Sequence, residues 1–274
     1  MLPRYLRPSV GASMLAAALP VAAYAAEPGW SLPPVPGEWT VKLGIEAEVA
    51  PAFEGSSQYL ISPVPVLSLR PAGRAARFSS ERDSGGIALI NLNGFHAGPA
   101  AKFKSARYES DSEQLRGLGD VDWALEIGGF AEYWPSEWLR TRVEVRRGFN
   151  GHEGIVADLT ADVVVPLPER WTLSGGPRVT FADGKAIAPY FSINAAQALA
   201  SGLPEFDAKG GLHSLGVGAQ VRYQWTQQWS SRLFVEYERL VGDAAASPLV
   251  AQRGSPDQVT VGAGVTYSFN IKLW

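Results

Sequence analysis

Apolar and polar residues alternate along much of this chain with a period of two. In 139–146 one parity reads Leu, Thr, Val, Val and the other reads Arg, Arg, Glu, Arg, and the pattern recurs in 121–133 and 259–270. Successive side chains of a strand point to opposite faces, so each stretch predicts a strand between an apolar and a polar medium. The stretches run roughly 10–15 residues. Strands of soluble sandwiches average about 5–6 residues, whereas a tilted strand that crosses a bilayer needs about 10. The pattern predicts an all-β protein, a transmembrane antiparallel up-and-down β-barrel.

Short polar breaks flanked by tryptophan separate several of these stretches. The breaks lie at 135–137, 166–170 and 226–228. Tryptophan at strand ends is typical of the aromatic girdle at a membrane interface. The predicted girdle residues are Trp134, Trp138, Trp171, Trp225 and Trp229.

Longer polar breaks fall at 109–119, 182–210 and 242–257. Bacterial barrels keep short turns on the periplasmic side and long loops outside, so we assign these breaks to the exterior. Strand parity then requires 182–210 to be a single loop, and its apolar piece from Tyr190 to Ile193 does not span.

The breaks divide the chain into about twelve predicted strands with both termini periplasmic. The predicted strands are 39–53, 59–70, 75–80, 86–92, 95–108, 120–134, 138–149, 154–165, 171–181, 211–225, 229–241 and 258–270. The weakest pair is 75–80 and 86–92. If these two form a non-spanning hairpin, the number is ten and the parity still closes.

The N-terminus has the features of a cleaved signal peptide. Arg4 and Arg7 precede a short run of small and apolar residues over 10–19, and Ala23-Tyr24-Ala25 fits the small-x-small rule before a cleavage site. We therefore predict a signal peptide over 1–25, a periplasmic lead over 26–38 and the barrel over 39–274. The expected location is the outer membrane of a Gram-negative cell.

Composition narrows the remaining possibilities. The chain has no cysteine, which excludes disulfides and thiolate metal sites. Its net charge of −3 provides no basic field for nucleic acid. Twenty-nine glycines suit strands that twist and bulge around a barrel. We expect outer-membrane lipid as the surroundings, with no cofactor and no nucleic-acid partner.

The polar parity of the strands carries many charges, which we expect to face the lumen. The predicted lumen-facing charges are Asp122, Glu126, Glu132, Arg140, Arg142, Arg146, Asp158, Asp162, Arg178, Arg222, Glu236 and Glu238, accompanied by Lys42, Glu46, Glu48 and Glu144. A carboxylate row on one strand thus neighbours an arginine row on the next. Cross-strand ion pairs that fill the lumen are one interpretation, and a charged eyelet that selects a solute is the other.

Catalysis would have to use His96, His152 or His213, the histidines of the chain. No serine lies in a G-x-S-x-G motif, and His152 stands in a glycine-rich turn. Three scattered histidines also lack the spacing of metal ligands. We therefore predict no enzymatic activity, no catalytic residues and no metal site.

Several turn and loop motifs occur in a recognisable order. They are Pro51-Ala52-Phe53-Glu54-Gly55-Ser56, Gly98-Pro99, Gly117-Leu118-Gly119-Asp120, Arg147-Gly148-Phe149-Asn150-Gly151-His152, Ser174-Gly175-Gly176-Pro177-Arg178, Ser201-Gly202-Leu203-Pro204 and Gly242-Asp243. Each alone marks an ordinary turn, but the series, which extends over the whole mature chain, resembles the MipA/OmpV family of Gram-negative outer-membrane proteins. One departure is that the C-terminal pattern Gly264-x-x-Tyr267-x-Phe269 is followed by five further residues.

The resemblance implies a non-enzymatic barrel. The name-giving member of the family is described as a scaffold that links a lytic transglycosylase to a bifunctional murein synthase. Other members are discussed as adhesins or in antibiotic uptake. We therefore expect a scaffold connected to murein (peptidoglycan) synthesis, with a small-solute or antibiotic-permeable channel as the alternative. The short periplasmic turns offer little area for a large soluble partner.

Overall fold

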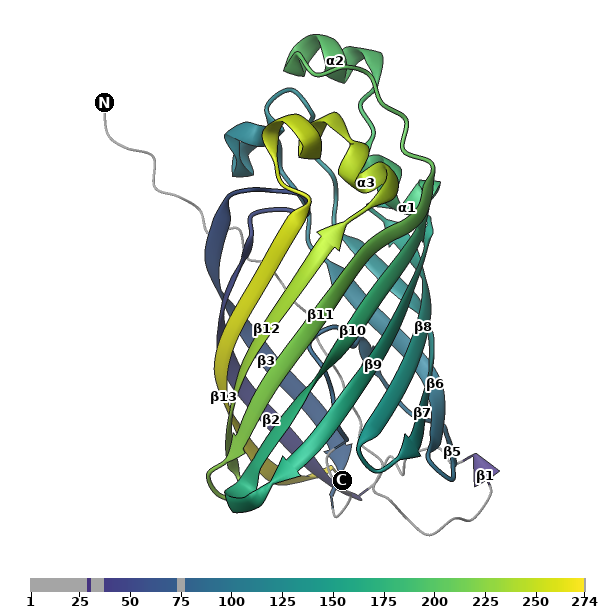
Figure 1. Ribbon diagram of the computed structural model, residues 1–274. Coiled ribbons are helices and arrows are strands. Elements are labelled where there is room, and N and C mark those ends of the chain that lie inside the picture. The colour runs from purple at the N-terminus through teal and green to yellow at the C-terminus, as the bar shows by residue number, and fades with distance from the viewer. Residues whose placement is uncertain (1–28, 31–36, 73–76, 274) are drawn as a thin grey trace, which may run out of the picture.

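The computed structural model describes residues 29–30, 37–72 and 77–273. Its strands tilt across the molecule and curl into a barrel, with helical loops at one end and short turns at the other (Figure 1). The predicted signal peptide, residues 1–25, lies outside the described residues. No helix in the described part of the chain is long and apolar enough to cross a membrane.

Ten strands of 10 to 17 residues build the wall. They are β2 (Gly37–Pro51), β3 (Tyr59–Pro71), β6 (Phe95–Lys104), β7 (Ala124–Ser136), β8 (Leu139–Asn150), β9 (Ile155–Leu167), β10 (Trp171–Asp183), β11 (Gly210–Gln224), β12 (Trp229–Leu240) and β13 (Asp257–Leu273). Three short strands, β1 (Gly29–Trp30), β4 (Gly85–Gly86) and β5 (Ile90–Leu92), lie beside them. All pairs are antiparallel, which confirms the predicted fold class.

The weak pair of predicted strands does not span. The stretch 77–80 forms no strand, and 85–92 pairs with β6 only through the short β4 and β5. The hydrogen-bonded path, β1-β5-β6-β7-β8-β9-β10-β11-β12-β13-β2-β3, therefore includes twelve strands, of which ten are long. The ten long strands form the wall itself, as in the ten-strand alternative, in which 75–80 and 86–92 do not span.

The two ends of the chain meet in the wall. Strand β13 pairs with β2 from Val261↔Val49 to Leu273↔Gly37. Among the described residues, β3 pairs with β2 alone, so its other side is a free edge. Pro63 and Pro65 lie in β3, and proline fits an edge strand because it has no N–H to donate.

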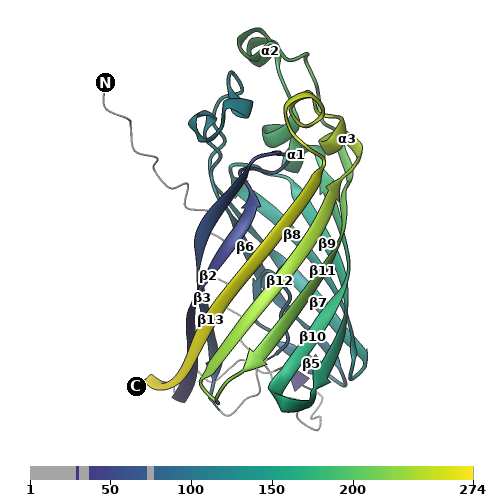
Figure 2. The same ribbon diagram turned by 60° about the vertical axis from the view of Figure 1, so that its left-hand side comes forward.

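The loops opposite the short turns carry the helices. They are α1 (Gly184–Phe191), α2 (Ala195–Ser201), α3 (Gly242–Ala246) and the π-helical turn Leu249–Arg253, and the 3-10 turns Glu109–Asp111 and Glu113–Leu115 lie in the 105–123 loop. They gather at the top of both views (Figures 1 and 2). The single-loop prediction for 182–210 is therefore confirmed. Side chains such as Phe191, Leu240 and Leu115 pack into apolar clusters that hold these loops over the barrel mouth.

Side-chain burial along the wall is the reverse of a soluble core. Ile45 is 63% exposed and Val143 is 42% exposed, whereas Arg140 is fully buried. Alternation of this kind places apolar side chains against lipid and charged ones in the lumen. The register inferred from the sequence for 139–146 is confirmed.

Candidate functional site

A segment without regular structure enters the lumen after β3. We call residues 77–84 the inner segment. Asp83 folds it into a tight turn, accepting hydrogen bonds from the Ser80 amide (3.1 Å) and hydroxyl (2.9 Å). Its charged side chains each meet an opposite charge on the wall: Arg77 with Glu132 (2.6 Å), Glu81 with Arg232 (2.7 Å), Arg82 with Glu236 (3.1 Å) and Glu238 (2.9 Å), and Asp83 with Arg140 (2.6 Å).

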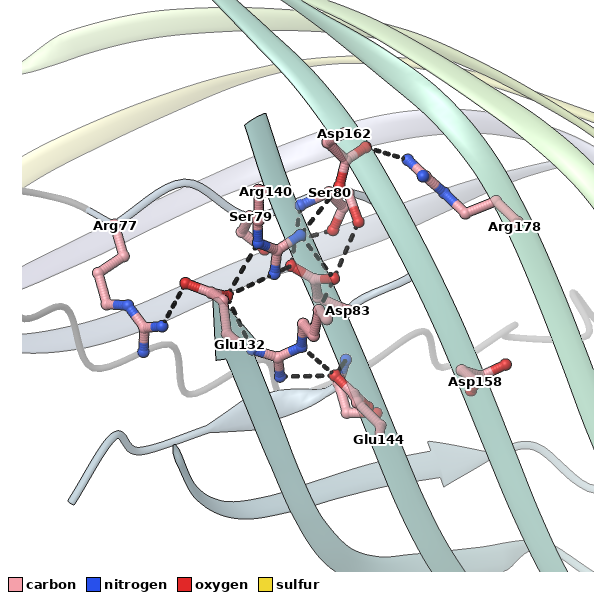
Figure 3. A network of polar contacts seen from close by, with 12 residues as sticks. Arg77, Ser79, Ser80, Asp83, Glu132, Arg140, Glu144, Asp158, Asp162 and Arg178 are labelled. Atoms are coloured by element: carbon pink, nitrogen blue, oxygen red, sulfur yellow. Dashed lines mark hydrogen bonds and ion pairs between the residues drawn. The ribbon is translucent and has the colours of Figure 1, made fainter. Parts of the chain in front are cut away.

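Arg140 of β8 is the centre of this network. Its guanidinium contacts Asp83 at 2.6 Å, Glu132 of β7 at 2.7 Å and Asp162 of β9 at 3.0 Å, and the side chain is completely buried. Figure 3 shows the three carboxylates around the arginine, with Arg178 of β10 bound to the far side of Asp162 at 2.6 Å. The inner segment and four neighbouring strands are thereby joined by charge-assisted hydrogen bonds.

Two more arginines of β8 extend the network towards the outer end. Arg142 contacts Glu132 at 3.3 Å and Glu144 at 2.5 Å. Arg146 contacts Glu144 at 2.6 Å, Glu126 at 2.9 Å and Asp158 at 2.5 Å. We call the inner segment and this arginine–carboxylate network the barrier, because their ion pairs join a segment inside the lumen to the wall.

Removing one partner from a buried ion pair leaves a charge without compensation, which costs about 3–5 kcal/mol. In the barrier each of the three β8 arginines touches at least two carboxylates, so the loss of one still leaves it a partner. The arrangement therefore fixes the inner segment through several contacts and not through one.

A cavity of about 230 Å³ lies above the barrier, beneath α1. Two histidine–carboxylate contacts line it: His152 with Glu126 (3.1 Å) and His213 with Glu54. Lys104 also contacts Glu54 at 2.9 Å and lies 3.8 Å from the ring centre of Tyr190. Burial alone would raise the pKa of Glu54, but Lys104 and His213 hold it well below its usual range.

Eleven of the twelve predicted lumen charges lie on the inner face of the wall, buried or half-buried. Glu132 faces Arg142 directly across the β7–β8 pair, while Glu126 faces Gly148 and reaches Arg146 instead. Asp122 differs from the prediction, because it is exposed in the loop before β7 begins.

Four of the five predicted girdle residues are exposed at the end with the short turns. They are Trp138, Trp171, Trp225 and Trp229. Trp171 and Trp225 both contact Tyr223, with ring centres 4.5 and 4.6 Å apart. The girdle assignment of Trp134 is wrong: its parity points inward, its Nε1 donates to Glu132 (2.9 Å), and its ring meets the edge of Phe78 in the inner segment.

Sequence reasoning missed the inner segment altogether, because it assigned part of it to a strand. The predicted strand 75–80 covers Arg77 to Ser80, whereas Glu81, Arg82 and Asp83 fall in the predicted break that follows it. Sequence reasoning also omitted Arg232, which shares the parity of Glu236 and contacts Glu46 at 2.6 Å. Within the described residues no three histidine or acidic side chains are placed to hold a metal ion.

Comparisons with known proteins address the family. No curated protein matches the chain. Among solved structures, an outer membrane channel from Pseudomonas putida F1 is 15% identical, with a TM-score of 0.43 over 89% of this chain and 100% of that one. OmpT of Vibrio cholerae is 7% identical, with a TM-score of 0.37 over 88% of this chain and 100% of that one. The NanC porin is 9% identical, with a TM-score of 0.41 over 84% of this chain and 98% of that one.

The family comparison covers most of the sequence. The family model described as "MltA-interacting protein MipA" matches residues 43–269, from within β2 to near the end of β13. The match agrees with the series of turn motifs and with the antiparallel barrel. The chain is an outer-membrane β-barrel protein that belongs to the MipA family.

Proposed function

We propose that this protein is a non-enzymatic scaffold of the outer membrane, connected to murein synthesis through protein–protein contacts, and not an open pore. The observation that carries the proposal is the contact of the fully buried Arg140 with Asp83, Glu132 and Asp162. A lumen crossed by a bound segment of the chain leaves little room for a continuous water path. The description of the matching family, an interacting protein, supports the same function.

Partners of this kind would bind on the periplasmic side. The turns there are short, but β1 adds to the surface: Gly29–Trp30 pair with Ile90–Asn91 at that end of the barrel. Gly29–Trp30, which belong to the lead that we predict over 26–38, therefore lie beside that rim. We propose this lead, together with the neighbouring turns, as the contact surface for a lytic transglycosylase and a murein synthase.

A small-solute channel is the second candidate. The cavity of about 230 Å³ above the barrier favours it, since a solute entering from outside would find a chamber there that is lined by both charged and apolar side chains. The inner segment is held by side-chain contacts and not by a strand ladder of its own, so its displacement would open the lumen.

Two measurements on the purified barrel test the scaffold against the channel. In planar bilayers we expect only small, infrequent conductance from wild type. Embedded in nanodiscs, the barrel should bind a purified lytic transglycosylase or a bifunctional murein synthase, and removal of residues 26–36 should weaken the binding. Leu199→Ser, at a fully exposed position of α2 on the opposite end, is the matched control. A large, stable, ion-selective conductance with no binding of either enzyme would replace the scaffold with the channel.

A further inference from the structure

Three basic side chains line the periplasmic part of the lumen, below the barrier. Lys42 lies in β2, Arg70 near the end of β3, and Arg222 near the end of β11. In the β2–β3 register Lys42 faces Ser68 and Thr40 faces Arg70, so Lys42 and Arg70 are diagonal neighbours on one face. In the β11–β12 register Arg222 directly faces Arg232.

These three cations differ from the arginines of the barrier in having no partner. Within residues 29–30, 37–72 and 77–273, no hydrogen bond or ion pair joins the side chains of Lys42, Arg70 or Arg222 to another group. The Arg70 Nε is buried with no acceptor. Two carboxylates of this part of the lumen, Glu46 and Glu81, are both occupied by Arg232, at 2.6 and 2.7 Å.

Lys42 is the member of this group that lies within range of the other two. Lys42 is within electrostatic range of the cations Arg222, Arg232 and Arg70, and Glu46 acts on it with the opposite sign. The other acid of this parity at the periplasmic end of β2, Glu38, is exposed and has no ion pair among the described residues. Like charges directly opposite each other in a sheet destabilise it. The sequence therefore concentrates positive charge here without compensating it within the described chain.

Arginine cannot relieve this repulsion by losing its proton, because its pKa lies above about 12. A charge away from bulk water needs a counter-charge or hydrogen-bond partners. The three side chains are half-buried and not sealed, so solvent and small ions reach them. The hydroxyl of Thr172, which faces Arg222 across the β10–β11 pair, adds a donor that an anion can use.

We propose that Lys42, Arg70 and Arg222 form a binding site for a phosphate group, which enters the lumen from the periplasmic side. Three cations without a partner among the described residues favour a multiply charged ligand over a single carboxylate, and phosphate carries about −1.5 to −2 at neutral pH. Arginine also matches the oxygens of phosphate through paired N–H donors. The phosphate is carried either by the free ion or by a small phosphate ester.

The test is calorimetric titration of the full, detergent-solubilised barrel with inorganic phosphate in chloride buffer. We expect saturable binding that weakens as the chloride concentration rises. Arg222→Gln and Lys42→Met should each raise the Kd about tenfold, as expected for the loss of one charge-assisted contact. Arg222→Lys keeps the positive charge but loses the paired N–H donors of the guanidinium. Its Kd for phosphate should therefore lie between those of wild type and Arg222→Gln.

Lys102→Met is the matched control, since Lys102 also lines the lumen without an ion pair among the described residues but lies in β6 above the barrier. The Lys102→Met barrel should bind phosphate with the same affinity as wild type. Heat-modifiable migration on a gel checks that every variant is folded.

A second titration with glycerol 3-phosphate separates the two sources: comparable binding assigns the site to phosphate esters, and binding of the inorganic ion alone assigns it to free phosphate. The proposal fails if folded wild type binds neither probe saturably, or if Arg222→Gln and Lys42→Met bind phosphate as wild type does.

Discussion

Asp83 of the inner segment lies 2.6 Å from Arg140 of β8, and both side chains are buried in the lumen. A residue outside the strands thus provides one of the carboxylates that contact an arginine of the wall. Glu132 and Asp162 supply the other two carboxylates from the strands on either side of β8. The inner segment is therefore held in the barrel by the same chemistry that links the strands of the wall.

Replacing Asp83 tests whether this contact closes the lumen. Asp83→Asn removes one charge-assisted contact of Arg140 and should lower the free energy of unfolding by about 1.5–3 kcal/mol. Because Arg140 keeps Glu132 and Asp162, the barrel should still fold, while its conductance in planar bilayers should rise above that of wild type. Asp111→Asn, in the outer 105–123 loop, should change neither quantity. An unchanged conductance in a destabilised Asp83→Asn barrel would show that Asp83 is not needed to close the lumen.

The orientation of the barrel can be read from single cysteines. Asp207 is 74% exposed in the loop between α2 and β11, and Gln227 is exposed in the short turn between β11 and β12. On intact cells an impermeant maleimide should label Asp207→Cys and leave Gln227→Cys unmodified. Permeabilised cells, in which both should react, provide the control. The reverse labelling would invert the topology.

Val143 tests the lipid-facing side of the wall. Its side chain is 42% exposed between the inward-facing Arg142 and Glu144. An arginine at this position near the bilayer midplane should cost about 2–4 kcal/mol. We expect Val143→Arg to lose most of its heat-modifiable folded form, and Val143→Leu to keep it. Equal folding of the two variants would place the register one residue away.

The contact of Glu54 with Lys104 and His213 predicts a pH dependence. These two groups hold the pKa of Glu54 well below its usual range. A carboxyl whose pKa is lowered on folding adds stability above its unfolded pKa, near 4.3, and the contribution is lost as the pH falls through the folded-state pKa. Glu54→Gln should therefore lower the free energy of unfolding at pH 7, and its difference from wild type should shrink below about pH 4.

Urea unfolding in detergent over this pH range measures the effect. Glu113→Gln is the matched control, because the Glu113 side chain is 88% exposed in the outer loop. A difference between wild type and Glu54→Gln that stays constant from pH 7 to pH 3 would contradict the assigned ionisation.

The sequence predicts the wall well because alternation is a local property of each strand. The inward positions of Arg140, Arg142 and Arg146 follow from period two alone. Their specific partners do not follow from it. Arg146 contacts Glu126, which lies diagonally across the β7–β8 pair, and that contact depends on the register of the two strands. The inner segment shows no periodic pattern in the sequence. Its place is set by contacts with strands distant in the chain, such as Asp83 with Arg140, 57 residues apart, and Arg82 with Glu236, 154 residues apart. Trp134 was misplaced because its position at a strand end was weighed above its parity.

The pairing of β13 with β2 has a consequence for how the barrel is assembled. These strands hold the last and the first spanning residues of the wall, and their register joins positions more than 200 residues apart, such as Gly37 and Leu273. The wall cannot close until synthesis has reached its final strand, and contacts of such long sequence separation form slowly. The inner segment, tied at both ends to β3 and β6, must then either be in place before that closure or slip inward afterwards past the free edge of β3. In the second order, the free edge of β3 serves as a passage for the chain's own residues during folding.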